Sequence, residues 1–405
     1  MMKIRKQKKS ASLDAIYSVY LFLLIFTTFN KGFVPFDFDL RIVVTVFSLF
    51  FAFLIISRPL RNKKLFSNPI SKWVLLLYSV IFLTTCVTND LSVLSRSEDF
   101  RNLVVLNAYN FINVFVILEY KYNKLNKFIY KAIKISAIFL ILSQVAVLMG
   151  VELPFANYHT ETTASVDDGV FGIASALGVS TRIDGYGIDP NYVSLVMMLF
   201  ICLALTYEKK ITKRILYIAL ASFSILISFS RTILLASIPV LLAMLIFFAI
   251  KRKTSSIKKA SYLLTAIVSA LFVMISIVKP FNESSSMNIR YSLWDRSVAL
   301  SQEKKFMGAG LGAFREYSLE YSGFYVQNHS TMFQMIAEHG IIAYIIFCII
   351  IAKILILCKD NKFLFIATLT FFVWSFTYET MYIPHLILYL GIVPKILLTS
   401  GEVKK

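Results

Sequence analysis

Charged residues are scarce in this sequence. Asp, Glu, Lys and Arg make up 16% of the 405 residues, against about a quarter in soluble globular proteins. Apolar residues make up 58%, and they gather in runs of 16 or more that are spread from end to end. This balance excludes a soluble enzyme, a nucleic-acid-binding protein and a disordered chain. The runs can cross a hydrocarbon core of about 30 Å, so the sequence predicts an all-α polytopic membrane protein.

Cysteine and histidine are sparse, with four residues of each. The cysteines lie in or at the end of apolar runs, which excludes a disulfide-stapled secreted domain; they are Cys86, Cys202, Cys348 and Cys358. The histidines are scattered and offer no metal-ligand spacing. No metal and no other cofactor are therefore expected.

Hydropathy predicts about twelve transmembrane helices in a single integral membrane domain, 1–405, without internal repeats. No small-residue cleavage site follows the basic start of the chain, so the first span is expected to be retained. The spans are expected at 15–30, 40–57, 72–88, 102–119, 129–150, 190–207, 214–229, 231–250, 259–278, 329–352, 362–378 and 383–399.

The distribution of charge supports this count. With both termini in the cytoplasm, the inner side holds 30 of the 42 Lys and Arg residues but only 5 of the 23 acidic residues. Every inner loop is then basic, as the positive-inside rule requires. Two outer loops are long, 151–189 and 279–328. Loops of that length in a compact bundle are usually functional, so we expect the chemistry on the outer face.

Arg231 stands between two apolar runs in ISFSRTILLASIP, with almost no loop around it. An arginine at that depth is costly unless it pairs, reaches the interface or has a function. It either ends a span as a snorkelling side chain or binds an anion through its forked guanidinium.

The first long loop ends in RIDGYGIDPNYVS. Asp189 is predicted to cap the sixth span, and Pro190 suits its first turn. The two preceding glycines allow a close backbone approach. A turn and a cap account for these residues but not for Arg182 or Asn191, which are candidates for the site.

In the second long loop, Arg290 precedes Trp294 by four residues, a spacing that places both on one face of a helix. The alternative is an amphipathic helix lying on the membrane surface. The glycine-rich GAGLGAF that follows lacks the spacing of a nucleotide-binding loop.

His329 begins the tenth span in NHSTMFQMIAEHGIIAY. Histidine transfers protons near neutral pH, but a plain helix start is an equal alternative. Glu338 would lie about 13 Å deeper and half a turn round, so we expect it to hydrogen-bond a neighbouring span instead of His329. Gly340 and Ala343 are expected to form a small surface for close helix packing.

Four blocks, taken together, resemble the O-antigen ligase and polymerase superfamily, most closely the Wzy-type polymerases. They are SRTILL (230–235), RIDGYGIDPN (182–191), RYSLW (290–294) with MGAGLGAF (307–314), and HSTMFQMIAEHGIIA (329–343). The family pattern of His, Glu, Gly and a small residue is matched by His329, Glu338, Gly340 and Ala343. Ser330 and Ala343 depart from the family's usual Asn and Gly.

The resemblance implies a fold like that of a type C glycosyltransferase, in the bacterial inner membrane, with its active site on the periplasmic side. It implies an inverting polymerase that moves a glycan from undecaprenyl pyrophosphate to a lipid-linked repeat unit. A chain-length co-polymerase is a further expected partner, besides the lipid bilayer and the lipid-linked donor and acceptor. Nucleic acid is not expected.

The expected roles follow from the charge of a departing diphosphate, which preorganised guanidiniums stabilise without a metal. Arg231 and Arg290, supported by Arg182, are predicted to bind the pyrophosphate. His329 is predicted either to accept the proton of the acceptor hydroxyl or to bind the pyrophosphate. Supporting roles are expected for Asn191, Glu338 and Trp294.

Three alternatives remain. An O-antigen ligase would use the same donor with lipid A-core as acceptor. A lipid-linked oligosaccharide flippase or transporter would normally carry ionisable residues near the midplane, whereas here they gather on the outer face. A metal-using transferase could act through Asp37 and Asp39, although capping of the second span explains these residues better.

Overall fold

The computed structural model describes residues 2–35, 38–57, 68–88, 98–121, 125–155, 163–165, 181–187, 189–228, 285–322, 328–379 and 381–402. Within these residues, eight helices contain stretches that are long and apolar enough to cross a membrane. They are α1 (Met2–Phe29), α2 (Leu40–Ser57), α3 (Pro69–Thr88), α5 (Glu98–Glu119), α6 (Leu125–Leu148), α8 (Pro190–Tyr207), α9 (Ile211–Ser228) and α14 (Thr331–Leu357).

Two shorter apolar segments follow α14. The first is α15 (Lys362–Ser375), and the second runs through α16 (His385–Ile387), a π-helical turn η6 (Leu388–Ile392) and α17 (Val393–Glu402). Together with the eight long helices they correspond to ten of the expected spans. The other two, 231–250 and 259–278, lie outside the described residues. The prediction of a polytopic helical membrane protein is confirmed.

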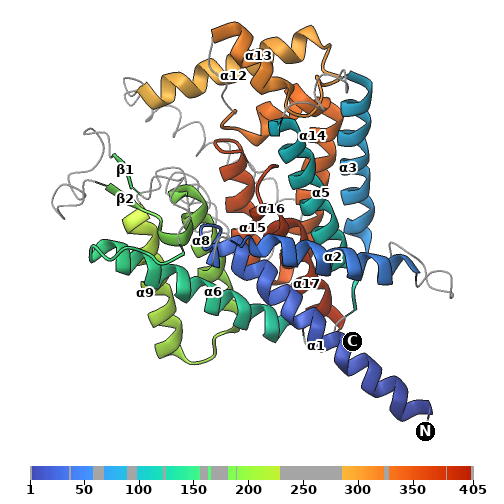
Figure 1. Cartoon of the computed structure of the whole chain (residues 1–405), viewed down its shortest axis with the longest axis vertical. Helices are drawn as coiled ribbons and strands as arrows, with labels where there is room; N and C mark the ends of the chain where they lie inside the picture. Colours follow the sequence, from blue (N-terminus) through green and yellow to red (C-terminus); the bar gives the residue numbers. More distant parts are fainter. Residues whose placement is uncertain are drawn as a thin grey trace, which may run out of the picture.

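The helices pack into one bundle with a continuous apolar core. Helices α3, α5 and α14 stand together on one side, and α8 packs against α9 and α15 (Figure 1). The largest fully buried side chains are aromatic, with Trp374 and Tyr389 among them. Many apolar residues of α2 and α3 are instead exposed, as in Phe53 (69%) and Val87 (81%). Such outward apolar faces suit lipid contact.

The second long loop contains two helices, α12 (Ser285–Glu303) and α13 (Ala313–Ser322). They lie across one end of the bundle (Figure 1). The helical spacing predicted for Arg290 and Trp294 is therefore confirmed. A small separate core holds this pair on α14, formed by Leu293, Leu300, Ala309, Phe314 and Ala337.

The first long loop contributes a short antiparallel ribbon, in which β1 (Thr163–Ser165) pairs with β2 (Thr181–Ile183). Arg182 stands opposite Ala164 in that register. After β2 the chain turns inward through a single 3-10 turn, η3 (Gly185–Gly187), and reaches the start of α8.

Helix α14 is broken at Gly340, whose backbone has φ 82° and ψ 168°. A Cβ added there would lie 2.5 Å from the Met307 carbonyl oxygen, so only glycine fits. The expected role of Gly340 in packing one helix against another is therefore wrong. It packs against loop backbone, because the chain between α12 and α13 enters the break.

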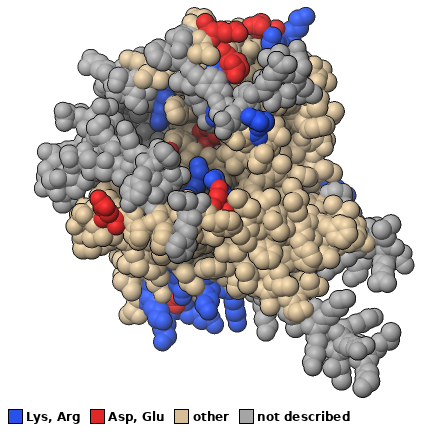
Figure 2. All heavy atoms as spheres, in the orientation of Figure 1, with Lys and Arg blue, Asp and Glu red and all other residues tan. Residues whose placement is uncertain are grey.

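Charged side chains lie mainly at the ends of the bundle. Figure 2 shows Lys and Arg side chains gathered where α6 and α9 begin. At the opposite end, around α12 and α13, acidic and basic side chains are mixed, and both signs surround a hollow between α12 and α2. This hollow is where the candidate site lies.

Candidate active site at one end of the bundle

The start of α8 forms the first part of the site. Asp189 caps the helix, because its Oδ1 accepts a hydrogen bond from the Asn191 backbone N–H at 2.7 Å, and Pro190 occupies the first turn. The predicted cap is confirmed. The second carboxylate oxygen of Asp189 accepts a hydrogen bond from the hydroxyl of Tyr378, beyond α15. The Asn191 side chain also hydrogen-bonds Tyr378.

His329 lies beside this group, one residue before the Ser330 that caps α14. Its ring is 5.9 Å from the ring of Tyr378, centroid to centroid. Burial lowers the pKa of His329 below 6.5, and the nearby Arg290 guanidinium lowers it further, while Asp189 opposes the shift. The lowered pKa favours the neutral imidazole, which is the form that can accept a proton.

Arg290 is held near His329 because α12 is fastened to the start of α14. The Asn328 side chain donates a hydrogen bond to the hydroxyl of Ser297 and contacts the Leu293 carbonyl at 3.4 Å. One turn into α14, the ring of Phe333 stacks on Trp294 at 5.3 Å between centroids. Trp294 thus has a packing role that orients the helix that carries Arg290.

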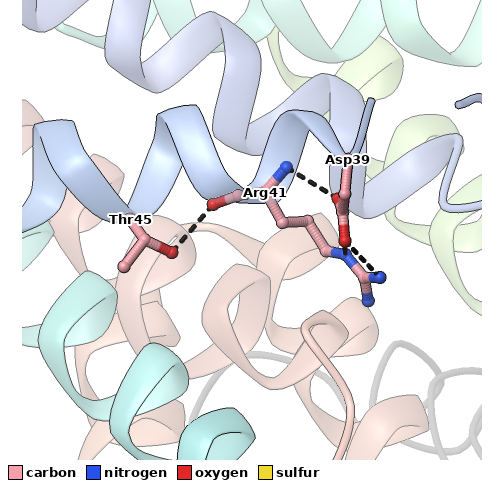
Figure 3. Close-up of polar contacts among 3 residues, drawn as sticks. All are labelled: Asp39, Arg41 and Thr45. Carbon is pink, nitrogen blue, oxygen red and sulfur yellow. Dashed lines mark hydrogen bonds and ion pairs between the residues drawn. The ribbon is translucent and has the colours of Figure 1, made fainter. Parts of the chain in front are cut away.

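The turn between α1 and α2 adds two more cations. Arg41 forms a 2.6 Å salt bridge with Asp39, which also accepts a hydrogen bond from the Arg41 backbone N–H. Figure 3 shows both side chains on one side of the first turn of α2. Asp39 thus caps α2, as expected, whereas Asp37 lies outside the described residues. Lys31 is partly buried nearby, and burial followed by the charge of Arg41 lowers its pKa.

The segment Asp184–Gly187 anchors this turn to the start of α8. The Gly32 N–H donates to the Tyr186 carbonyl at 2.7 Å, and the Tyr186 ring stacks on Phe139 of α6. Gly185 has φ 54°, and a Cβ there would lie 2.3 Å from the Ser143 Oγ. The predicted close backbone approach is confirmed here, and it brings α1, α6 and α8 together beneath the site.

Glu338 lies deeper in α14 and is fully buried. One of its oxygens accepts a hydrogen bond from the Tyr382 hydroxyl, and the other from the Phe314 backbone N–H at 3.3 Å. The expectation that Glu338 bonds to a neighbouring segment and not to His329 fits these contacts. Beside it, the N–H groups of Ala309 and Gly310 donate to the carbonyls of Ala337 and Glu338.

The structure brings together three of the predicted residues, Asn191, Arg290 and His329. Arg231 lies outside the described residues, and the side chain of Arg182 is likewise not described. Sequence reasoning did not assign Tyr378 or Lys31 to the site. Lys31 follows the apolar run of α1 and Tyr378 follows that of α15. Aromatic and basic residues are common at such positions in any membrane protein, so neither residue stands out in the sequence.

Acidic and basic side chains are mixed at this end. Lys31, Arg41 and Arg290 lie near the carboxylates of Asp39 and Asp189, and the guanidiniums are groups that can bind an anion. Within the parts of the chain that the structure describes, no three His, Cys, Asp or Glu residues are grouped to hold a metal ion. The fold and this site define a polytopic membrane protein with a histidine, an arginine and an asparagine from distant segments gathered at one end of its bundle.

Comparison with known families identifies the class more closely. A family model described as O-antigen ligase matches residues 216–348, which include Arg231, Arg290 and His329. This match covers about a third of the chain and supports the O-antigen ligase and polymerase superfamily, whose members are glycosyltransferase-like enzymes. No curated protein matched the chain.

Proposed function

We propose that the protein is a polysaccharide polymerase that transfers a glycan from undecaprenyl pyrophosphate to a lipid-linked repeat unit on the periplasmic face. One observation carries this proposal: Arg290, His329 and Asn191, from three segments far apart in the sequence, converge on one end of the bundle. The match to the superfamily supports the class of reaction.

In the proposed reaction, the imidazole of His329 accepts the proton of the acceptor hydroxyl as its oxygen attacks the anomeric carbon. The bond from that carbon to the pyrophosphate oxygen breaks, and the configuration inverts. Arg290 stabilises the charge that develops on the diphosphate, together with Arg231 and Arg182. The protonated imidazole then releases its proton to solvent. Tyr378 and Asp189 orient the imidazole.

The test uses a strain that lacks the gene and variants Arg290→Ala and His329→Ala. Each variant should lose the ladder of long glycan chains at normal membrane levels. Loss of one cation should raise the barrier by about 2.5–4 kcal/mol, by analogy with a lost oxyanion donor. Lys304→Ala is the matched control, because Lys304 directly follows α12, is exposed and forms its ion pair with exposed Glu303. Full-length chains from both site variants would refute the proposal.

An O-antigen ligase is the second candidate, because the matching family model carries that description. It would use the same site with lipid A-core as acceptor. The deletion strain separates the two. Loss of a polymerase leaves single repeats attached to core, whereas loss of a ligase leaves long unattached polymer.

A further inference from the structure

A cavity of about 510 Å³ lies between α12 and α13, on the side of α12 away from the bundle core. Its volume falls within the range of small-ligand pockets, about 300–1,000 Å³. The side chains that line it are chiefly aromatic or polar and include Asn288, Tyr291, Asp295, Arg296, Tyr317 and Tyr321.

Two of the three tyrosines of this cavity, Tyr291 and Tyr321, lie outside the apolar core that joins the helices, whereas Tyr317 packs partly against it. Packing of α12 and α13 onto α14 is provided by the separate apolar core that includes Leu293, Leu300 and Phe314. Tyr321 is instead 70% exposed, and Tyr291 is 37% exposed. Aromatic rings that are partly exposed at a cavity indicate a surface that can bind a ligand.

Two of the tyrosine rings at the cavity are held in place by contacts with their neighbours. Tyr317 and Tyr321 are one turn apart on α13, and their rings are stacked with centroids 6.2 Å apart. The Arg296 guanidinium lies 5.4 Å from the Tyr321 ring centre and donates a hydrogen bond to Ser318 Oγ at 3.0 Å. Arg296 therefore holds one side of the cavity in place from α12.

This chemistry matches a carbohydrate. The faces of sugar rings carry aligned C–H groups that stack on aromatic rings, and the hydroxyls at their edges bond to amides, carboxylates and guanidiniums. The cavity offers both kinds of contact, through three tyrosines and through Asn288, Asp295 and Arg296. An acyl chain would find few aliphatic partners here, and a diphosphate would meet the Asp295 carboxylate.

The position also fits. Tyr291 of the cavity is the next residue after Arg290 of the site, so one helix carries both. A glycan whose diphosphate is bound at Arg290 would leave the site along α12. The volume admits a short oligosaccharide and not a long polymer.

We propose that the cavity between α12 and α13 is a binding site for a short oligosaccharide, which retains the glycan end of a lipid-linked substrate. This inference rests on the proposed function, because it assigns the cavity to a substrate of the same reaction. Tyr317 and Tyr321 stack on the sugar rings, and Asn288 and Asp295 bond to their hydroxyls. Retention of the glycan between additions lengthens the product.

The experiment measures binding without turnover. The full-length protein in nanodiscs is titrated with the repeat-unit oligosaccharide, released by mild acid from the lipid-linked precursor of the same strain, and binding is followed by saturation-transfer NMR. Tyr317→Ala and Tyr321→Ala should each weaken binding about tenfold. Tyr321→Phe keeps the ring and should bind as the wild type does.

Leu319→Ala is the matched control, because Leu319 lies on α13 between the two tyrosines, is 41% exposed and does not line the cavity. It should bind normally. In the deletion strain, the two alanine variants should still add single units but give shorter chains. If either alanine variant is misfolded, its melting temperature and its membrane level will be low. Asn288→Ala, which should weaken binding, then provides the test, and Tyr321→Phe, which should bind normally, is its control.

Unchanged oligosaccharide binding by the tyrosine variants overturns the inference, even if chain length falls, since that pattern indicates a protein partner on this surface. The two proposals fail separately. If Tyr317→Ala loses binding while Arg290→Ala and His329→Ala still make normal polymer, the oligosaccharide site stands and the proposed reaction is refuted.

Discussion

Two regions of helix α14, its capped start and its break at Gly340, are built differently. At its start, His329 is surrounded by partly buried side chains from α8, α12 and the segment after α15. At Gly340 the contacts are between backbones, because the N–H of Ile341 donates to the Phe306 carbonyl at 3.0 Å and the N–H of Gly310 donates to the Glu338 carbonyl at 2.7 Å. The first region is built from side chains, whereas the second has no space for one.

Gly340→Ala should have the largest effect of the changes considered. The added methyl group meets the Met307 carbonyl at 2.5 Å in a conformation with positive φ. We expect a loss of more than about 3 kcal/mol of stability, and little folded protein in the membrane. Fluorescence-detected size exclusion of the solubilised protein measures this.

Gly150→Ala provides the control for that change. Gly150 also has a positive φ, of 74°, but no atom lies within 4 Å of the added Cβ. Its cost should be limited to the backbone term of about 1 kcal/mol. Equal losses from the two variants would show that the contact with Met307 is unimportant.

Glu379 follows Tyr378 of the first region, accepts a hydrogen bond from the backbone N–H of Tyr382, and should link stability to pH. Burial raises its pKa to about 8, and the charge of Glu338 adds to the shift. The folded state therefore binds this proton more tightly than the unfolded chain does. Its contribution is fully present below about pH 4.5 and is lost as pH rises through 8, with a size on the order of a few kcal/mol.

The measurement is the melting temperature of the protein in nanodiscs between pH 5 and pH 9. It should fall with rising pH in the wild type and fall much less in Glu379→Gln, which can still accept the backbone N–H bonds of Met381 and Tyr382. Glu320→Gln, at an exposed position on α13, is the control. An unchanged slope in Glu379→Gln would assign the dependence to another group.

The smallest expected effect is a shift of the acid limb of the pH–rate profile, which depends on the pKa of His329 at the start of α14. Arg290 lowers the pKa of His329, whereas Asp189 raises it. The limb should therefore move to higher pH in Arg290→Gln and to lower pH in Asp189→Asn, by less than about one unit in each case. Asparagine can still cap α8, so its helix is retained.

Initial rates of a single transfer from lipid-linked repeat unit, measured from pH 5 to pH 8, give these limbs. Tyr378→Phe serves as the comparison, since it removes a hydroxyl but no charge near the imidazole at these pH values. Shifts of the same sign in both charged variants would mean that His329 does not control the limb.

The sequence predicted those features of the fold and the site that depend on a local pattern of residues. Runs of apolar residues predicted the spans, the Asp-Pro pair predicted the start of α8, and a four-residue spacing predicted the helix of Arg290. The break in α14 was not predicted, because the run around Gly340 is uniformly apolar and its only sign is one glycine. Tyr378 was missed because its partners, Asp189 and Asn191, lie almost 190 residues away in the chain.

The fastening of α12 to α14 has a consequence for substrate exchange. Contacts at Asn328 and at Gly340 join these two helices near and below the site, so Arg290 and His329 belong to one rigid unit. Asp189 and Tyr378 come from other helices. If the proposed reaction requires the bundle to widen between lipid carriers, the guanidinium and the imidazole should move together, whereas the aspartate and the tyrosine should stay with the other segments.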